Sequence, residues 1–427
     1  MASHSKAASL DLDCVLDTEI DWRYKSFPAE PPVTIRSLRE RGWNALGGDF
    51  MFPVMLLKNS ALRYNVDAMA SLCSRAGVYL APHAKTSMAP QLVQMQLEAG
   101  AWAVTAATTW QVRVWRTFGA DRIILANELV EPASIEWLCS EMRRDAELDF
   151  YCLVDSVAAV NALDRAPGFK VLLELGFGGG RAGCRTEEEA LAVAAAVKAS
   201  SHVTLAGIEA FEGIIPADDL ATALSSVDGL LSRIRTLAGH LDAGGHFAGT
   251  DEILLTAGGS AFFDRVIEQL ARPWALSKPV RTVLRSGCYV THDAVHYREA
   301  SPLGSRLQGT DPLEEAFEVW GAVLSIPEPG LALLGFGKRD VPYDLGLPVP
   351  RYIKTGREAP RGFARAAEIF NTNDQHAYLR VDAAENIKVG DLVGCGISHP
   401  CTAFDKWRLI PVVDDGYGVI DALMTFF

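Results

Sequence analysis

The sequence predicts an α/β protein with a (β/α)8 barrel of the TIM type and a second, β-rich domain built from both chain ends. In the middle of the chain, a short apolar run followed by a helical stretch recurs eight times. Strands that alternate with helices pair in parallel, and eight such units over roughly ~250 residues are typical of the barrel. The flanks carry strand-like runs with little helical periodicity, which indicates a separate β-rich domain.

The apolar runs define the eight expected barrel strands. They are residues 78–84, 103–106, 122–126, 150–154, 170–174, 204–209, 253–257 and 280–285. Expected helices include residues 61–75, 90–98 and 187–199. We therefore assign residues 58–289 to the barrel.

The flanks supply the expected β-rich domain. Its strand-like runs include residues 318–326, 376–381 and 391–397, and the segment 53–58 is a candidate crossing between the domains. We assign residues 1–57 and 290–427 to this domain.

Composition excludes several classes of protein. The chain has 427 residues, is 49% hydrophobic and 22% charged, and carries a formal charge of -13 without a basic stripe, so we expect no nucleic-acid partner. We find no apolar run of the ~18 residues needed to span a membrane and no signal-peptide core. The eight cysteines include no CxxC pair. We expect a cytoplasmic protein without membrane partners.

The segment VYLAPHAKTS, residues 78–87, carries the strongest chemical signal. It places His83 and Lys85 at the end of the first expected strand, and barrel enzymes keep their chemistry at strand ends. The fifth strand leads into a glycine-rich loop with Arg181 at the same rim. A lysine and an arginine are therefore expected at one mouth of the barrel.

A candidate phosphate cradle follows the seventh strand. The sequence TAGGS places Gly258, Gly259 and Ser260 there, where glycines let backbone N–H groups close on a phosphate. Glycine pairs are also common in plain turns. Together with Lys85, this cradle fits pyridoxal phosphate (PLP), a phosphate-bearing aldehyde held by a lysine. A sugar-phosphate barrel in which Lys85 is incidental remains an alternative.

Near the C-terminus, His399 and Cys401 stand two residues apart in SHPCTAFDKW. On an extended segment both would face the same way, as a metal-binding pair does. An isolated His-x-Cys pair is more often buried structure than a metal site.

These motifs resemble the fold-type III PLP enzymes of the D-serine dehydratase and D-threonine aldolase family, related to the alanine racemase N-terminal domain. The chain is most similar to D-serine deaminase-like proteins. The motifs are PHAKT, RAG, TAGGS, SGCYVTHD and HPC, in the order of the family. The resemblance implies that Lys85 holds the cofactor, Arg181 faces its pyridine nitrogen, and residues 258–260 hold its phosphate. It also implies a homodimer, zinc on His399 and Cys401, and Tyr289 as a second base, with His83 beneath the cofactor.

The resemblance implies a dehydratase that converts D-serine or a similar β-hydroxy D-amino acid to a 2-oxo acid and ammonia. Cys401 favours this reaction, since the aldolases carry His-x-Asp, and thiolate with imidazole suits zinc. A D-threonine-type aldolase, a racemase and a non-catalytic PLP homeostasis protein remain alternatives. The loop after the sixth strand carries Glu209 and Glu212, whose roles stay open.

Overall fold

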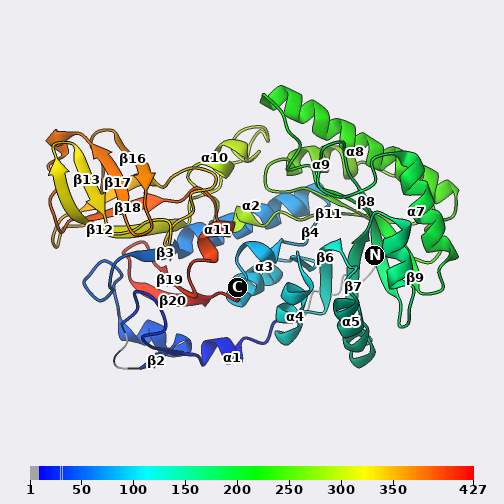
Figure 1. Ribbon diagram of the computed structural model, residues 1–427, viewed down its shortest axis with the longest axis horizontal. Coiled ribbons are helices and arrows are strands. Elements are labelled where there is room, and N and C mark those ends of the chain that lie inside the picture. Colours follow the sequence, from blue (N-terminus) through cyan, green and yellow to red (C-terminus); the bar gives the residue numbers. More distant parts are fainter. Residues whose placement is uncertain (1–8, 29, 31) are drawn as a thin grey trace.

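The structure, a computed structural model, describes residues 9–28, 30 and 32–427 and sets a barrel beside a β-rich domain (Figure 1). Residues 1–8, 29 and 31, which the sequence analysis assigned to the β-rich domain, lie outside the described residues. No helix in the described ranges is long and apolar enough to cross a membrane.

Eight parallel strands form the barrel, in the order β4-β11-β10-β9-β8-β7-β6-β5. They are β4 (Tyr79–Leu80), β5 (Val104–Ala106), β6 (Arg122–Glu128), β7 (Asp149–Val154), β8 (Phe169–Leu175), β9 (Val203–Ala210), β10 (Ile253–Ala257) and β11 (Val280–Leu284). The two edges meet where the Trp102 amide donates to the Leu80 carbonyl at 2.6 Å and the Thr105 amide to the Pro82 carbonyl at 3.0 Å. The predicted barrel is confirmed.

Helices precede and follow these strands in sequence. They are α2 (Asn59–Ala76), α3 (Pro90–Glu98), α4 (Thr109–Thr117), α5 (Pro132–Arg144), α6 (Val157–Leu163), α7 (Glu187–Ala199), α8 (Leu220–Ala243) and α9 (Phe263–Leu270). Local signals set their ends: a capping box of Thr186 and Glu189 starts α7, and Gly77 at φ +65° ends α2. The helices expected at residues 90–98 and 187–199 have those bounds in the structure.

The first barrel strand is shorter than predicted. The expected run 78–84 forms a strand only over β4, because Pro82 has no N–H to donate to a ladder. The chain then turns into a short 3-10 helix, η2 (Ala84–Thr86). Lys85 therefore sits on a tight turn just beyond the strand.

The β-rich domain draws on both sides of the barrel in sequence. Its strands are β3 (Val54–Lys58), β12 (Phe317–Glu328), β13 (Leu331–Leu334), β14 (Val349–Lys354), β15 (Arg361–Gly362), β16 (Ala367–Thr372), β17 (Ala377–Val381), β18 (Leu392–Gly396), β19 (Leu409–Val413) and β20 (Val419–Met424). The N-terminal strand β3 pairs antiparallel with β12 and parallel with β19. Both chain ends build this sheet, as predicted.

Short elements complete the described chain. They are α1 (Asp13–Leu16), β1 (Glu19–Ile20), β2 (Val33–Thr34), η1 (Ile35–Arg41), η3 (Cys288–Val290), α10 (His296–Ala300), η4 (Ala383–Glu385) and α11 (Cys401–Phe404).

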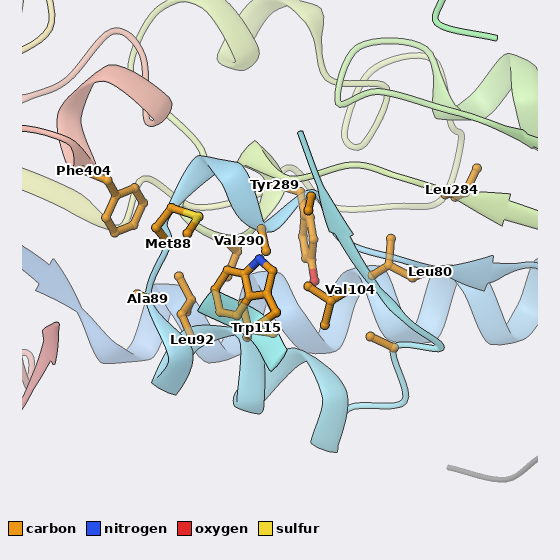
Figure 2. Close-up of a cluster of buried hydrophobic side chains, with 14 of the residues drawn as sticks. Leu80, Met88, Ala89, Leu92, Val104, Trp115, Leu284, Tyr289, Val290 and Phe404 are labelled. Atoms are coloured by element: carbon orange, nitrogen blue, oxygen red, sulfur yellow. The ribbon is translucent and has the colours of Figure 1, made fainter. Parts of the chain in front are cut away.

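Buried side chains join the barrel to the β-rich domain. Figure 2 shows one such cluster, in which Met88 and Trp115 from the barrel side lie with Phe404 from α11. Phe404 also packs edge-on against Phe317 of β12, with ring centroids 4.7 Å apart. This packing fixes α11, which begins at Cys401, against the turn that carries Lys85.

Candidate functional site

A cavity of about 110 Å³ opens at the carboxyl end of the barrel strands. Its polar and aromatic lining comes from six different strand ends or loops and comprises His83, Lys85, Asn127, Arg181, Glu209, Phe211, Gly259 and Arg285. The structure thus brings together four of the residues predicted from sequence, namely His83, Lys85, Arg181 and Gly259.

Burial shapes the protonation of His83 and Lys85. Burial, together with nearby cationic groups, holds the pKa of His83 well below its ordinary value, so this imidazole is neutral. Burial also lowers the pKa of Lys85, and Arg181 adds to this, although the neighbouring Cys401 acts in the opposite direction. A lowered lysine pKa enlarges the fraction of free amine, the form that reacts with an aldehyde or accepts a proton.

Arg181 reaches the cavity from the glycine-rich loop after β8. Its guanidinium lies over the ring of Phe211, 5.1 Å from the ring centroid. Phe211 follows β9, so this contact joins two loops of the barrel mouth. A guanidinium at this position can face a ring nitrogen or an anionic group of a ligand.

The predicted phosphate cradle holds an anionic group of the protein itself. The amide of Gly258 donates to Glu212 Oε2 at 3.1 Å and the amide of Gly259 to Oε1 at 2.7 Å. Gly258 adopts φ +94°, which lets the two amides converge. The Glu212 carboxylate shows that these groups bind an anion, and this chemistry fits the phosphate of PLP.

Arg285 is a cavity residue that sequence reasoning missed. It directly follows the last barrel strand, β11, and forms a buried ion pair with Glu209, while its other amino group donates to Thr256 Oγ1 at 2.7 Å. Burial raises the pKa of Glu209, and Arg285 opposes this shift. The predicted eighth strand, residues 280–285, ended on this arginine. Its place at a strand end was the one sequence feature that could have identified it as a cavity residue.

The predicted metal-binding pair, His399 and Cys401, lies at the start of α11 and not on an extended segment as predicted. Pro400 adopts helical dihedral angles and starts the helix, so Cys401 is its first residue. Burial lowers the pKa of His399, but hydrogen bonds with Cys401 and Asp344 outweigh burial and raise it to about 9. The two side chains therefore still meet, despite the different backbone.

Asp344 orients the imidazole of His399. His399 Nδ1 lies 2.6 Å from Asp344 Oδ2, and Thr402 Oγ1 donates to the other carboxylate oxygen at 2.8 Å. Metal-binding histidines commonly make such a carboxylate contact through their second ring nitrogen. A thiol with an imidazole suits zinc. Within the described residues, no group of three His, Cys, Asp or Glu side chains is spaced to hold a metal ion.

A second thiol accompanies Cys401. The sulfur of Cys288 lies 3.4 Å from that of Cys401, and Thr86 Oγ1 is also 3.4 Å from the Cys401 sulfur. The hydrogen bond with Cys288 has the largest effect on the pKa of Cys401. Together with the contacts of His399 and Thr86, it holds this pKa well below its ordinary value. Because Thr86 directly follows Lys85, the thiol pair contacts the turn that carries Lys85, while the cavity lining itself includes neither thiol.

Tyr289 does not reach this site, which goes against its predicted role as a second base. The 3-10 turn η3 directs Cys288 toward Cys401 and Tyr289 into the buried cluster of Figure 2. There its hydroxyl accepts a hydrogen bond from Gln96 at 2.9 Å, and burial raises its pKa.

A larger cavity, of about 400 Å³, lies next to β12 and includes His292, Glu315 and Arg351 in its lining. It contains none of the predicted site residues.

Two family models match consecutive parts of the chain. The alanine racemase N-terminal domain matches residues 57–257, and a putative serine dehydratase domain matches residues 316–413. Among curated proteins, the chain is 24% identical over 319 residues to the 3-hydroxy-D-aspartate aldolase of Paracoccus denitrificans (strain Pd 1222), covering 72% of this chain and 78% of that protein. It is 24% identical over 371 residues to the D-threonine aldolase of Arthrobacter sp, covering 85% and 89%.

Solved structures share the fold. The D-threonine aldolase from Filomicrobium marinum matches with a TM-score of 0.72 and 22% identity, over 88% of this chain and 95% of that one. The D-threo-3-hydroxyaspartate dehydratase from Delftia sp. HT23 matches with a TM-score of 0.67 and 18% identity, over 88% and 97%. The family resemblance that the motifs predicted is confirmed.

Proposed function

The chain matches the family models of an alanine racemase N-terminal domain and a putative serine dehydratase domain, and from this premise we propose that it is a fold-type III PLP enzyme, namely a PLP- and zinc-dependent D-amino-acid dehydratase. Its proposed substrate is D-serine or a similar β-hydroxy D-amino acid, and its products are a 2-oxo acid and ammonia. One observation carries the proposal: Thr86, adjacent to Lys85, contacts Cys401. A reactive lysine and a thiol–imidazole pair therefore serve one substrate.

Each of the cavity residues has a separate proposed role toward the cofactor. When bound, PLP would withdraw electrons from the substrate's Cα. Lys85 holds the cofactor and then takes the Cα proton, for which its lowered pKa prepares it. Arg181 faces the pyridine nitrogen. Because an arginine stays protonated at any ordinary pH, it would not donate its proton to that nitrogen. The Gly258 and Gly259 amides, with Ser260, hold the phosphate.

The pair of His399 and Cys401 is proposed to bind zinc beside the leaving hydroxyl. Hydroxide is a poor leaving group, and zinc can lower the pKa of bound water from ~15.7 to ~7, which shows how strongly it stabilises an oxyanion. Asp344 holds the His399 ring through Nδ1, and the ring also forms a hydrogen bond with Cys401. Zinc held by these two residues would stabilise a departing hydroxide in the same way.

A D-threonine-type aldolase, which releases glycine and an aldehyde, is the second candidate. The curated relatives named above are aldolases, and this favours it. Cys401 argues for the dehydratase, because a thiolate ligand marks a zinc site. A non-catalytic PLP homeostasis protein consists of the barrel alone, so the β-rich domain argues against that alternative.

The proposed enzyme is a cytoplasmic homodimer. All eight cysteines are free in the structure, which suits a reducing compartment. The dimer rests on the family resemblance.

Product analysis tests the proposed function. Purified protein with PLP is given D-serine, D-threonine and D-threo-3-hydroxyaspartate, with and without a chelator, and Lys85→Ala serves as the inactive control. A 2-oxo acid with ammonia, lost on chelation and restored by zinc, is the expected result. Glycine with an aldehyde would establish the aldolase instead, and no turnover of any substrate would contradict both.

A further inference from the structure

The carboxylate of Glu212 occupies the two backbone amides that the proposed function assigns to the cofactor phosphate. Gly258 N and Gly259 N donate to its two oxygens at 3.1 and 2.7 Å. Glu212 is fully buried, with an exposed fraction of 0%. In the structure an internal carboxylate therefore takes up both N–H groups of the cradle.

Glu212 and a phosphate cannot use this cradle together. Both are anions, and each needs the same two N–H groups as hydrogen-bond donors. Among the described residues, Glu212 forms no ion pair that would hold its charge elsewhere in the barrel mouth. Its two amide contacts are thus what compensates for its burial, and a bound phosphate would remove them.

The loop that carries Glu212 also touches the rest of the cavity. Glu212 follows β9, and its neighbour Phe211 lies under the Arg181 guanidinium. A side chain added at Gly259 would come within 3.1 Å of the Phe211 ring and 3.5 Å of Glu212 Oε1, so these groups pack tightly. The Glu212 side chain, Gly259 and the ring beneath Arg181 are therefore neighbours in one tightly packed region.

We propose that Glu212 is an internal competitor for the phosphate site, which leaves the cradle when a phosphate-bearing cofactor binds. The inference rests on the proposed PLP function. It predicts that Glu212 weakens the binding of phosphate-bearing ligands alone. Pyridoxal, which has the same aldehyde and ring without the phosphate, provides the matched probe.

The test compares cofactor-free wild type with Glu212→Ala, Glu212→Gln and Asp218→Asn. Asp218 is exposed on the same loop, so its variant removes one charge without touching the cradle. PLP and pyridoxal are titrated into each protein and followed by ligand absorbance and tryptophan fluorescence. Circular dichroism checks that each variant is folded. If Glu212→Ala does not fold, the isosteric Glu212→Gln variant provides the test.

We expect Glu212→Ala to bind PLP at least about tenfold more tightly, which corresponds to ~1.4 kcal/mol. Pyridoxal binding should stay within about twofold, and Asp218→Asn should match wild type for both ligands. Inorganic phosphate should raise the melting temperature of Glu212→Ala more than that of wild type.

Equal or weaker PLP binding by both Glu212 variants would overturn the inference and leave the proposed function in place. PLP binding that is unchanged in Lys85→Ala would instead refute the proposed function. In that case the phosphate-induced melting shift still decides whether Glu212 competes for the cradle.

Discussion

Removal of Arg285 should leave a buried, uncompensated carboxylate at the barrel mouth. Arg285 and Glu209 are 5% and 1% exposed, and the second oxygen of Glu209 has no hydrogen-bond partner among the described atoms. Breaking a buried ion pair by removing one partner typically costs ~3–5 kcal/mol, whereas removing both charges is often nearly neutral. We expect Arg285→Met to lower the free energy of unfolding by about that amount, and Arg285→Met with Glu209→Gln to recover most of it.

The pH dependence gives this prediction a second readout. Burial already raises the pKa of Glu209, and loss of Arg285 raises it further. The folded variant then binds a proton more readily than the unfolded chain, so the stability defect should shrink as the pH falls and grow as the pH rises.

Urea unfolding of wild type, both single variants and the double variant, at acidic and neutral pH, measures both effects. If the two single losses add up to the double loss within ~0.5 kcal/mol, the ion pair does not couple and the reasoning is refuted.

Three further predictions concern Asp293, Lys85 and Cys401. Asp293, which follows η3, is buried and accepts hydrogen bonds from the backbone amides of Val295 and Tyr297. Burial raises its pKa to about 7, so wild type should lose stability as the pH rises from about 4 to 7, and Asp293→Asn should flatten that slope in melting curves. An equal slope in the variant would contradict this prediction. Lys85→Ala should abolish the visible absorbance of the bound cofactor at unchanged circular dichroism, and retained absorbance would place the cofactor elsewhere. Cys401→Ala should keep that absorbance but lose zinc and elimination, measured by metal analysis and 2-oxo acid release, whereas the buried Cys395→Ala control should keep both.

Sequence alone determined the repeating architecture and the chemistry of single motifs. Alternation of apolar runs with helical stretches predicted the barrel, because side-chain periodicity is set locally by the helix and the strand. The order of PHAKT, RAG, TAGGS and HPC predicted which residue types would meet. It also predicted Lys85 at a strand end, since the carboxyl ends of parallel strands lie on one rim.

Contacts between distant segments were decided only by the tertiary structure. Cys288 and Cys401 are 113 residues apart along the chain, His399 and Asp344 are 55 apart, and Glu212 and Gly259 are 47 apart. These separations are too long for any local pattern to encode. The positions of Cys288 and Tyr289 were also beyond the reach of the sequence. These two residues are adjacent on a 3-10 turn, yet Tyr289 points into the core and Cys288 points toward Cys401. Such directions depend on packing against the whole fold, and a linear spacing does not contain them.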